Sequence, residues 1–133
     1  TEGLHTLMSS EFKEKRKFPR HRIYTPAQLE MFDSSLPVSV MELSVEGVRL
    51  HSASSVSPET HVAIRINVGR EIVFHGQVVW VMNVLTAKGH IYKMGIQTDV
   101  ILDKGDEILG ITEKEILIQE IVILTKREET DKD

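Results

Sequence analysis

The sequence predicts a mainly β protein: a small six-stranded antiparallel β-barrel with an irregular N-terminal leader and a C-terminal helix. Two observations favour this fold class. Short segments of alternating apolar and polar residues recur between residues 26 and 98, with turn-forming residues at short intervals between them. A denser apolar run follows residue 112, after a pattern that fits a helix start. A closed barrel would also remove the exposed edges that many short strands otherwise leave.

The chain of 133 residues, 41% of them hydrophobic, is long enough for one ordinary globular domain. We expect a leader over residues 1–25, a barrel over residues 26–110, and a helix with a charged tail over residues 111–133. The absence of cysteine excludes disulfides, thiolate nucleophiles and cysteine-based zinc sites. No stretch approaches the roughly 20 apolar residues that span a bilayer, so membrane insertion is not expected.

The leader shows no sustained periodicity and ends in a charged segment. Pro19 and Pro26 favour extended geometry at the residues before them. We therefore predict an extended loop that carries the basic residues. The first strand is predicted at residues 27–32, and Asp33-Ser34-Ser35 supplies turn chemistry after it.

Five more strands are predicted from alternation with a period of two and from turn residues. The clearest of them places Val62, Ile64 and Ile66 on one face. The longest includes Trp80. We favour a place for Trp80 in the core of the barrel, and a place at the border of the ligand surface is the alternative. The five strands cover residues 38–43, 47–51, 61–67, 71–84 and 90–98.

The last segment fits a helix that begins with a capping box, in which Thr112 caps the first turn and Glu115 reaches back to it. The apolar residues that follow would cover most of the helix surface near its middle, so the helix must be buried or paired. We favour a helix packed across the barrel. A self-association helix is the alternative, and a strand also stays open because the run is rich in β-branched residues.

Positive charge is concentrated at the end of the leader. The formal net charge is −4, yet six of the sixteen Lys and Arg residues lie within ten positions. A local basic cluster on an acidic chain favours a small anionic ligand over a long polyanion such as DNA. The cluster consists of Lys13, Lys15, Arg16, Lys17, Arg20 and Arg22.

A carboxylate, a hydroxyl and a glycine follow about twenty residues later, at Glu42, Ser44 and Gly47. Guanidinium groups match phosphate oxygens and the O6/N7 edge of guanine, and a carboxylate accepts hydrogen bonds from guanine N–H groups. Together the two segments suit an anionic guanine nucleotide. Ser44 could hydrogen-bond a phosphate or a base of the ligand, or its hydroxyl could bond the local backbone of a turn. Gly47 is expected to serve geometry, through a positive φ or by letting a flat ring approach.

These residues resemble the two signatures of the PilZ domain, the bacterial receptor module for cyclic di-GMP. The first signature, RxxxR, reads Arg16-Lys17-Phe18-Pro19-Arg20 here, and the second, D/N-x-S-x-x-G, reads Glu42-Leu43-Ser44-Val45-Glu46-Gly47. Residues 76–80 and 92–96 look like the family's later strands. The resemblance implies a split-barrel fold, cyclic di-GMP as the ligand, no enzymatic activity and the bacterial cytoplasm as the location.

By this resemblance, Arg16 and Arg20 would grip phosphate and the Hoogsteen edge of guanine, with Glu42, Ser44 and Gly47 facing them. The family usually has Asp or Asn where this chain has Glu42. The extra methylene shifts the acceptor by roughly one bond, and each guanine donor left unpaired would cost about 1–3 kcal/mol.

Other residues of the basic segment are expected to have smaller roles. Lys15 and Lys17 would add positive potential near the ligand. His21 is the histidine expected closest to the ligand, because it follows Arg20. The six histidines lack the spacing of metal ligands, and no catalytic motif is present, so neither a metal, a cofactor nor catalysis is expected.

The leading hypothesis is a non-enzymatic receptor whose N-terminal loop becomes ordered on binding cyclic di-GMP and signals to a downstream protein partner. The alternative is a PilZ-like interaction domain that binds no nucleotide and acts through its apolar C-terminal segment, including as a homo-oligomer. A barrel that binds single-stranded nucleic acid would need an aromatic platform, and aromatic residues make up only 5% of the chain.

Overall fold

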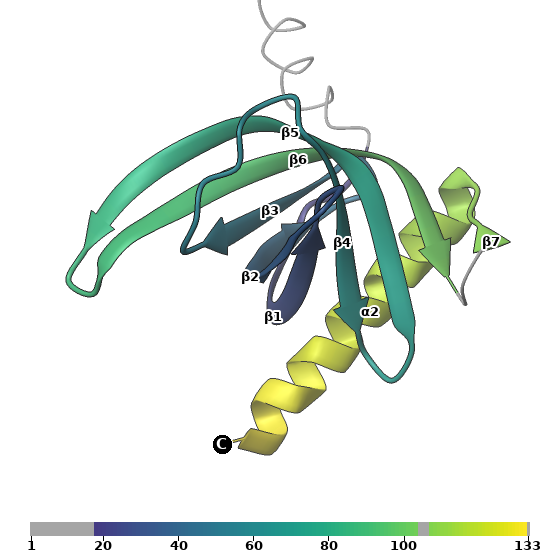
Figure 1. The fold of residues 1–133 in the computed structure, drawn as a ribbon. Coiled ribbons are helices and arrows are strands. Elements are labelled where there is room, and N and C mark those ends of the chain that lie inside the picture. Colours follow the sequence, from purple (N-terminus) through teal and green to yellow (C-terminus); the bar gives the residue numbers. More distant parts are fainter. Residues whose placement is uncertain (1–17, 104–106, 133) are drawn as a thin grey trace, which may run out of the picture.

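The computed structural model describes residues 18–103 and 107–132 (Figure 1). Within these ranges, a set of strands is followed by one long helix. The elements are β1 (His21–Glu30), β2 (Ser35–Leu43), β3 (Gly47–Ser52), β4 (His61–Asn67), β5 (Glu71–Thr86), β6 (Gly89–Asp103), β7 (Glu107–Ile108) and α2 (Ile111–Lys132).

The strands close into a ring. Neighbours are antiparallel in the order β3-β2-β1-β4-β5-β6, and β3 pairs back to β6. The predicted arrangement of six antiparallel strands is therefore confirmed. A further strand of two residues, β7, pairs with the end of β6 and is too short to produce a pattern in the sequence.

The first strand begins six residues earlier than predicted, at His21 instead of residue 27. The predicted strand began after Pro26, and residues 1–25 were assigned to the leader. In the structure Pro26 lies within β1, opposite Ser39 of β2. In the described part of the chain, β4 pairs with β1 only at residues 28–30, and a proline is tolerated beside such an open edge. Residues 21–25, assigned to the leader from the sequence, thus form the first half of β1.

The core follows the alternation seen in the sequence. Val62, Ile64 and Ile66 of β4 all point inward and are buried. The helix contributes Leu117 and Ile121 to the same cluster, and α2 packs against β1. Figure 1 shows α2 running across one end of the ring. The favoured prediction for this segment, a helix packed across the strands, is confirmed.

The start of α2 differs from the prediction. Gly110, not Thr112, occupies the N-cap, and its amide donates to Glu113 Oε1 at 3.0 Å. Glu115 does not reach back to a cap, because its Oε1 lies 3.5 Å from His21 Nε2 of β1. The capping pattern is therefore present two residues earlier than expected, with glycine in the cap position.

Within the described ranges, no helix combines the length and the apolar character needed to cross a membrane.

Arg70, in the turn between β4 and β5, joins the sheet to the helix. Its Nε donates to Asp103 Oδ1 at 2.8 Å, and its Nη1 and Nη2 donate to the two carboxylate oxygens of Glu120 at 2.9 and 3.2 Å. The hydrogen bonds with Glu120, and then those with Asp103, raise the pKa of Arg70. Because Asp103 is buried, it depends on this arginine for compensation of its charge.

Replacing Arg70 with alanine is expected to lower the free energy of unfolding by about 2–3 kcal/mol, because the buried Asp103 carboxylate loses its charge-assisted hydrogen bond. Chemical denaturation measures the loss. Arg65→Ala is the matched control, since Arg65 pairs with the more exposed Glu30 and Glu71, and exposed ion pairs contribute about 0–1 kcal/mol. Equal losses in the two variants would contradict a special role for Arg70.

Candidate functional site

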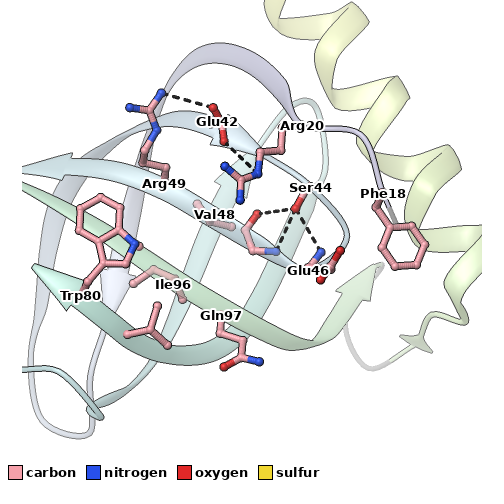
Figure 2. Close-up of a pocket in the computed structure, with 13 residues that line it drawn as sticks. Phe18, Arg20, Glu42, Ser44, Glu46, Val48, Arg49, Trp80, Ile96 and Gln97 are labelled. Atoms are coloured by element: carbon pink, nitrogen blue, oxygen red, sulfur yellow. Dashed lines mark hydrogen bonds and ion pairs between the residues drawn. The ribbon is translucent and has the colours of Figure 1, made fainter. Parts of the chain in front are cut away.

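A cavity lies over β2, β3, β5 and β6, beside the segment that leads into β1 (Figure 2). Its volume is about 680 Å³, within the range of small-molecule sites in proteins. Charged, polar and apolar side chains share its surface. The lining residues are Phe18, Arg20, Glu42, Ser44, Glu46, Gly47, Val48, Arg49, Val79, Trp80, Gly95, Ile96 and Gln97.

Glu42 lies between two arginines at this cavity. Its Oε1 is 3.7 Å from Arg20 Nε, and its Oε2 is 3.4 Å from Arg49 Nη2; Figure 2 shows the three side chains together. The side chain of Arg20 is 51% exposed, and ion pairs open to water are weak. An anion that binds the guanidinium more strongly can therefore replace Glu42 as the partner of Arg20.

The turn between β2 and β3 is held by its own hydrogen bonds. Ser44 Oγ accepts from the amides of Glu46 at 3.2 Å and Gly47 at 3.1 Å. Thr98 of β6 fastens the turn, donating from its amide to the Glu46 carbonyl at 2.9 Å and from its hydroxyl to the Val45 carbonyl at 3.2 Å. Ser44 thus fills the turn role that the sequence allowed, and this side of the cavity is fixed before any ligand arrives.

Gly47 is required by close packing and not by a positive φ. The described glycines with a positive φ are Gly69 and Gly89. A Cβ at position 47 would lie 2.7 Å from the carbonyl oxygen of Ile96 on β6, closer than Cβ atoms approach in proteins. Of the two geometric roles expected for Gly47, a positive φ is therefore not observed, and the glycine lets β3 and β6 come together beside the cavity.

The structure brings four of the predicted site residues to this one cavity: Arg20, Glu42, Ser44 and Gly47. Arg20 comes from the segment before β1, and the other three come from the end of β2, the β2–β3 turn and the start of β3. Their contact with a ligand stays a prediction. Three other predicted residues lie outside the described part of the chain: Lys15, Arg16 and Lys17.

His21 does not line the cavity. Its Nε2 faces α2, where it lies 3.5 Å from Glu115 Oε1. His21 was expected near the ligand because it follows Arg20, but it is the first residue of β1 and its side chain lies against α2 instead. The geometry therefore does not support a ligand contact by His21.

Arg49 lines the cavity although the sequence analysis did not select it. It lies between the buried residues Val48 and Leu50 on β3, and it stands opposite Glu42 in the β2–β3 register. An outward-facing arginine across from the carboxylate of the motif is the signal that identifies it. Recognising this signal requires the pairing of the two strands, which the sequence alone does not supply.

Arginine, not histidine, supplies positive charge at the cavity. Burial lowers the pKa of His51 on β3, and Lys93 and Arg49 lower it further. His51 is not among the residues that line the cavity. Arg20 and Arg49 are the cationic side chains among the described residues that line the cavity.

Trp80 is 40% exposed and lines the cavity, so the expectation that it lies in the core is wrong. A bulge in β5 between Val78 and Trp80 interrupts the alternation of the strand. Val78 is buried, whereas Val79 and Trp80 are both exposed. A Cβ at Gly95 would lie 2.1 Å from Trp80 Nε1, so the indole rests on the backbone of Gly95. The cavity thereby gains an aromatic wall.

Comparison with known proteins agrees with this fold. The model of the PilZ domain family matches residues 14–113. Among solved structures, the PilZ domain with c-di-GMP of YcgR from Escherichia coli has a TM-score of 0.59 at 19% identity, over 89% of this chain and 96% of that one. No curated protein matches the chain.

Two longer proteins share the fold. The Bacillus subtilis inhibitor of motility MotI (DgrA) has a TM-score of 0.58 at 16% identity, over 90% of this chain and 53% of that one. The K. pneumonia MrkH–c-di-GMP complex has a TM-score of 0.59 at 14% identity, over 89% of this chain and 55% of that one. This chain thus spans about half the length of each. The family match covers most of the sequence, and the chain belongs to the PilZ domain family.

Proposed function

We propose that this chain is a non-enzymatic receptor domain for cyclic di-GMP. The observation that carries the proposal is the meeting of Arg20 with the Glu42–Gly47 segment at one cavity. Membership of the PilZ family supports it, and two of the similar structures are described as complexes with c-di-GMP. We propose the bacterial cytoplasm as the place where the domain meets its ligand.

Binding would begin with an exchange of partners at Arg20. The Arg20 guanidinium lies 3.7 Å from the Glu42 carboxylate, and the side chain of Arg20 is 51% exposed. A phosphodiester or the O6/N7 edge of guanine offers the same guanidinium two acceptors at once, a stronger arrangement. Glu42 would then be free to accept from guanine N–H groups, with Arg49 still holding its second oxygen.

The rest of the ligand would meet the aromatic wall and the basic N-terminal segment. A guanine base can stack on the exposed indole of Trp80. We propose that Arg16 grips the ligand from the other side, with Lys15 and Lys17 adding positive potential. Ordering of this segment around the nucleotide would form the surface that a downstream protein partner recognises.

Isothermal titration calorimetry with cyclic di-GMP tests the proposal. We expect saturable binding, together with a higher thermal unfolding temperature in the presence of the nucleotide, because a ligand that binds the folded state stabilises it. GMP serves as the control for a single guanine and a single phosphate. A folded protein that gives neither heat nor a thermal shift with cyclic di-GMP would contradict the receptor function.

The variant Glu42→Asp is expected to bind cyclic di-GMP as tightly as the native protein or more tightly. Aspartate keeps the acceptor for guanine N–H groups, and its shorter side chain reaches less far towards Arg20, which releases the guanidinium for the ligand. Calorimetry measures the change. A large loss of affinity would show instead that the longer side chain of Glu42 has a geometry of its own in the site.

A second candidate function is an interaction domain that binds no nucleotide. Two observations favour it: Glu42 stands where the resembling motif has Asp or Asn, and α2 exposes Ile116 and Ile123. Light scattering of Ile116→Lys and Ile123→Lys variants tests whether this face of α2 drives association. These substitutions are preferable to removal of the helix, because Leu117 and Ile121 belong to the core.

A further inference from the structure

The hairpin of β5 and β6 extends beyond the ring as a two-stranded arm, which Figure 1 shows projecting past β3. β4 pairs with β5 only as far as Gln77. The loop before β4 then supplies two hydrogen bonds at Val78, from the Glu59 amide to the Val78 carbonyl at 2.6 Å and from the Val78 amide to the Thr60 carbonyl at 3.0 Å. From residue 79 to residue 86, no strand in the described part of the chain pairs with this edge of β5.

The free edge lacks the features that usually protect an exposed strand. Residues 79–86 contain no charged residue and no proline, the devices by which proteins discourage pairing at an edge. The one irregularity, the bulge between Val78 and Trp80, lies at the base of the arm. Apolar side chains are exposed along the rest, with Met82 at 53% and Leu85 at 73%. β3 pairs with β6 only as far as Tyr92, which lies opposite Asn83, so the arm has two strands from residue 84 to residue 91. A two-stranded ribbon is only marginally stable in water without a third strand.

We propose that residues 79–86 of β5 pair antiparallel with the same residues of a second copy of this chain, joining two rings through one continuous sheet. A two-fold antiparallel pairing is self-complementary, because each strand offers the other the same free N–H and C=O groups. The segment is uncharged, so no like charges face each other within it. Full overlap of the two edges places the two-fold axis near Met82 or Asn83.

Charge complementarity supports a second copy as the occupant. In the overlapped arrangement, the tip of one arm lies beside the point where β4 and its loop stop covering β5 in the other copy. Lys88 is in that tip. Glu59 of the second copy is exposed, and its amide donates to the carbonyl of Val78. Glu59 would therefore lie beside Lys88 of the first copy. The symmetry forms this pair twice.

The basic residues of the arm do not oppose the pairing. Lys93 stands opposite Met82 on β6, one strand inside the free edge. In the joined sheet, the two Lys93 residues are three strand spacings apart, about 14 Å. That distance exceeds the screening length of about 8 Å at physiological ionic strength.

Disulfide trapping tests the arrangement directly, because the native chain has no cysteine. Each variant is oxidised without nucleotide, and dimers are counted on a non-reducing gel. We expect Met82→Cys or Asn83→Cys to cross-link, since only residues at the axis meet their own copies. Phe32→Cys, in the exposed β1–β2 turn, and Gln119→Cys, on the exposed face of α2, are the controls. Cross-linking at Gln119 but at neither arm position would overturn the proposal and assign dimerisation to the helix.

Sedimentation velocity over a wide range of protein concentration gives a second, independent measurement. We expect the native chain to form a dimer that dissociates on dilution, and the double variant Met82→Lys, Leu85→Lys to weaken it at least tenfold. Phe32→Lys places a lysine at an exposed apolar position elsewhere on the surface and should have no effect. A native chain that stays monomeric throughout, or a double variant that dimerises like the native chain, would refute the pairing. Because no nucleotide is present, neither result bears on cyclic di-GMP binding.

Discussion

Replacing Arg20 with alanine is expected to weaken cyclic di-GMP binding at least tenfold and to leave the fold intact. A hydrogen bond to a charged group contributes about 1.5–3 kcal/mol, and a loss of 1.4 kcal/mol already corresponds to a tenfold change in affinity. The fold should tolerate the change, because Arg20 is 51% exposed and its pair with Glu42 is long. Calorimetry measures the affinity, and thermal unfolding checks the fold.

Arg22→Ala is the matched control for this variant. Arg22 belongs to the same basic cluster but lies outside the cavity that Arg20 lines. Its removal should change affinity little at physiological salt, where long-range attraction is screened. Equal losses for the two variants would mean that the cluster acts through its general potential. An Arg20→Ala variant that binds like the native protein would remove Arg20 from the site, and the same reasoning applies to Arg16→Ala.

The sequence was sufficient for the ring of strands because burial of one face leaves a period of two, as in Val62, Ile64 and Ile66. Features that depend on a partner element were not predictable in the same way. Pro26 appeared to delimit a strand, yet β1 continues through it because β4 reaches β1 only later. The N-cap of α2 is Gly110 and not Thr112, because Glu113, not Glu115, reaches back to the cap.

The candidate site was predictable only in part. Arg20, Glu42, Ser44 and Gly47 were selected through motif spacing, and the fold brings all four to one cavity. Arg49 was missed because its relation to Glu42 exists only across the β2–β3 register. Trp80 was misplaced because a bulge in β5 turns it outward. Local patterns therefore revealed the motif, whereas strand register and the bulge determined which other side chains surround it.

Replacing Trp80 with alanine is expected to lower cyclic di-GMP affinity by roughly five- to hundredfold, because stacking of a base on an aromatic side chain contributes about 1–3 kcal/mol. The indole is partly exposed and lines the cavity, so its loss should disturb the core little. Calorimetry compares Trp80→Ala with Trp80→Phe, which keeps a smaller ring and should retain part of the affinity. Equal affinity in the native protein and both variants would exclude stacking on Trp80.

Gly95→Ala tests the same wall without altering the tryptophan. An added Cβ would lie 2.1 Å from Trp80 Nε1 and 2.5 Å from Cε2, so the indole must move away from the backbone of Gly95. We expect weaker binding and a change in the fluorescence of the single tryptophan. If Gly95 acts only by seating the indole, the substitution should add nothing in a Trp80→Ala background, which a double-mutant cycle measures. If the losses of affinity from Gly95→Ala and Trp80→Ala simply add, position 95 affects binding through the backbone of β6. The need to place the indole would then not be the reason for a glycine at this position.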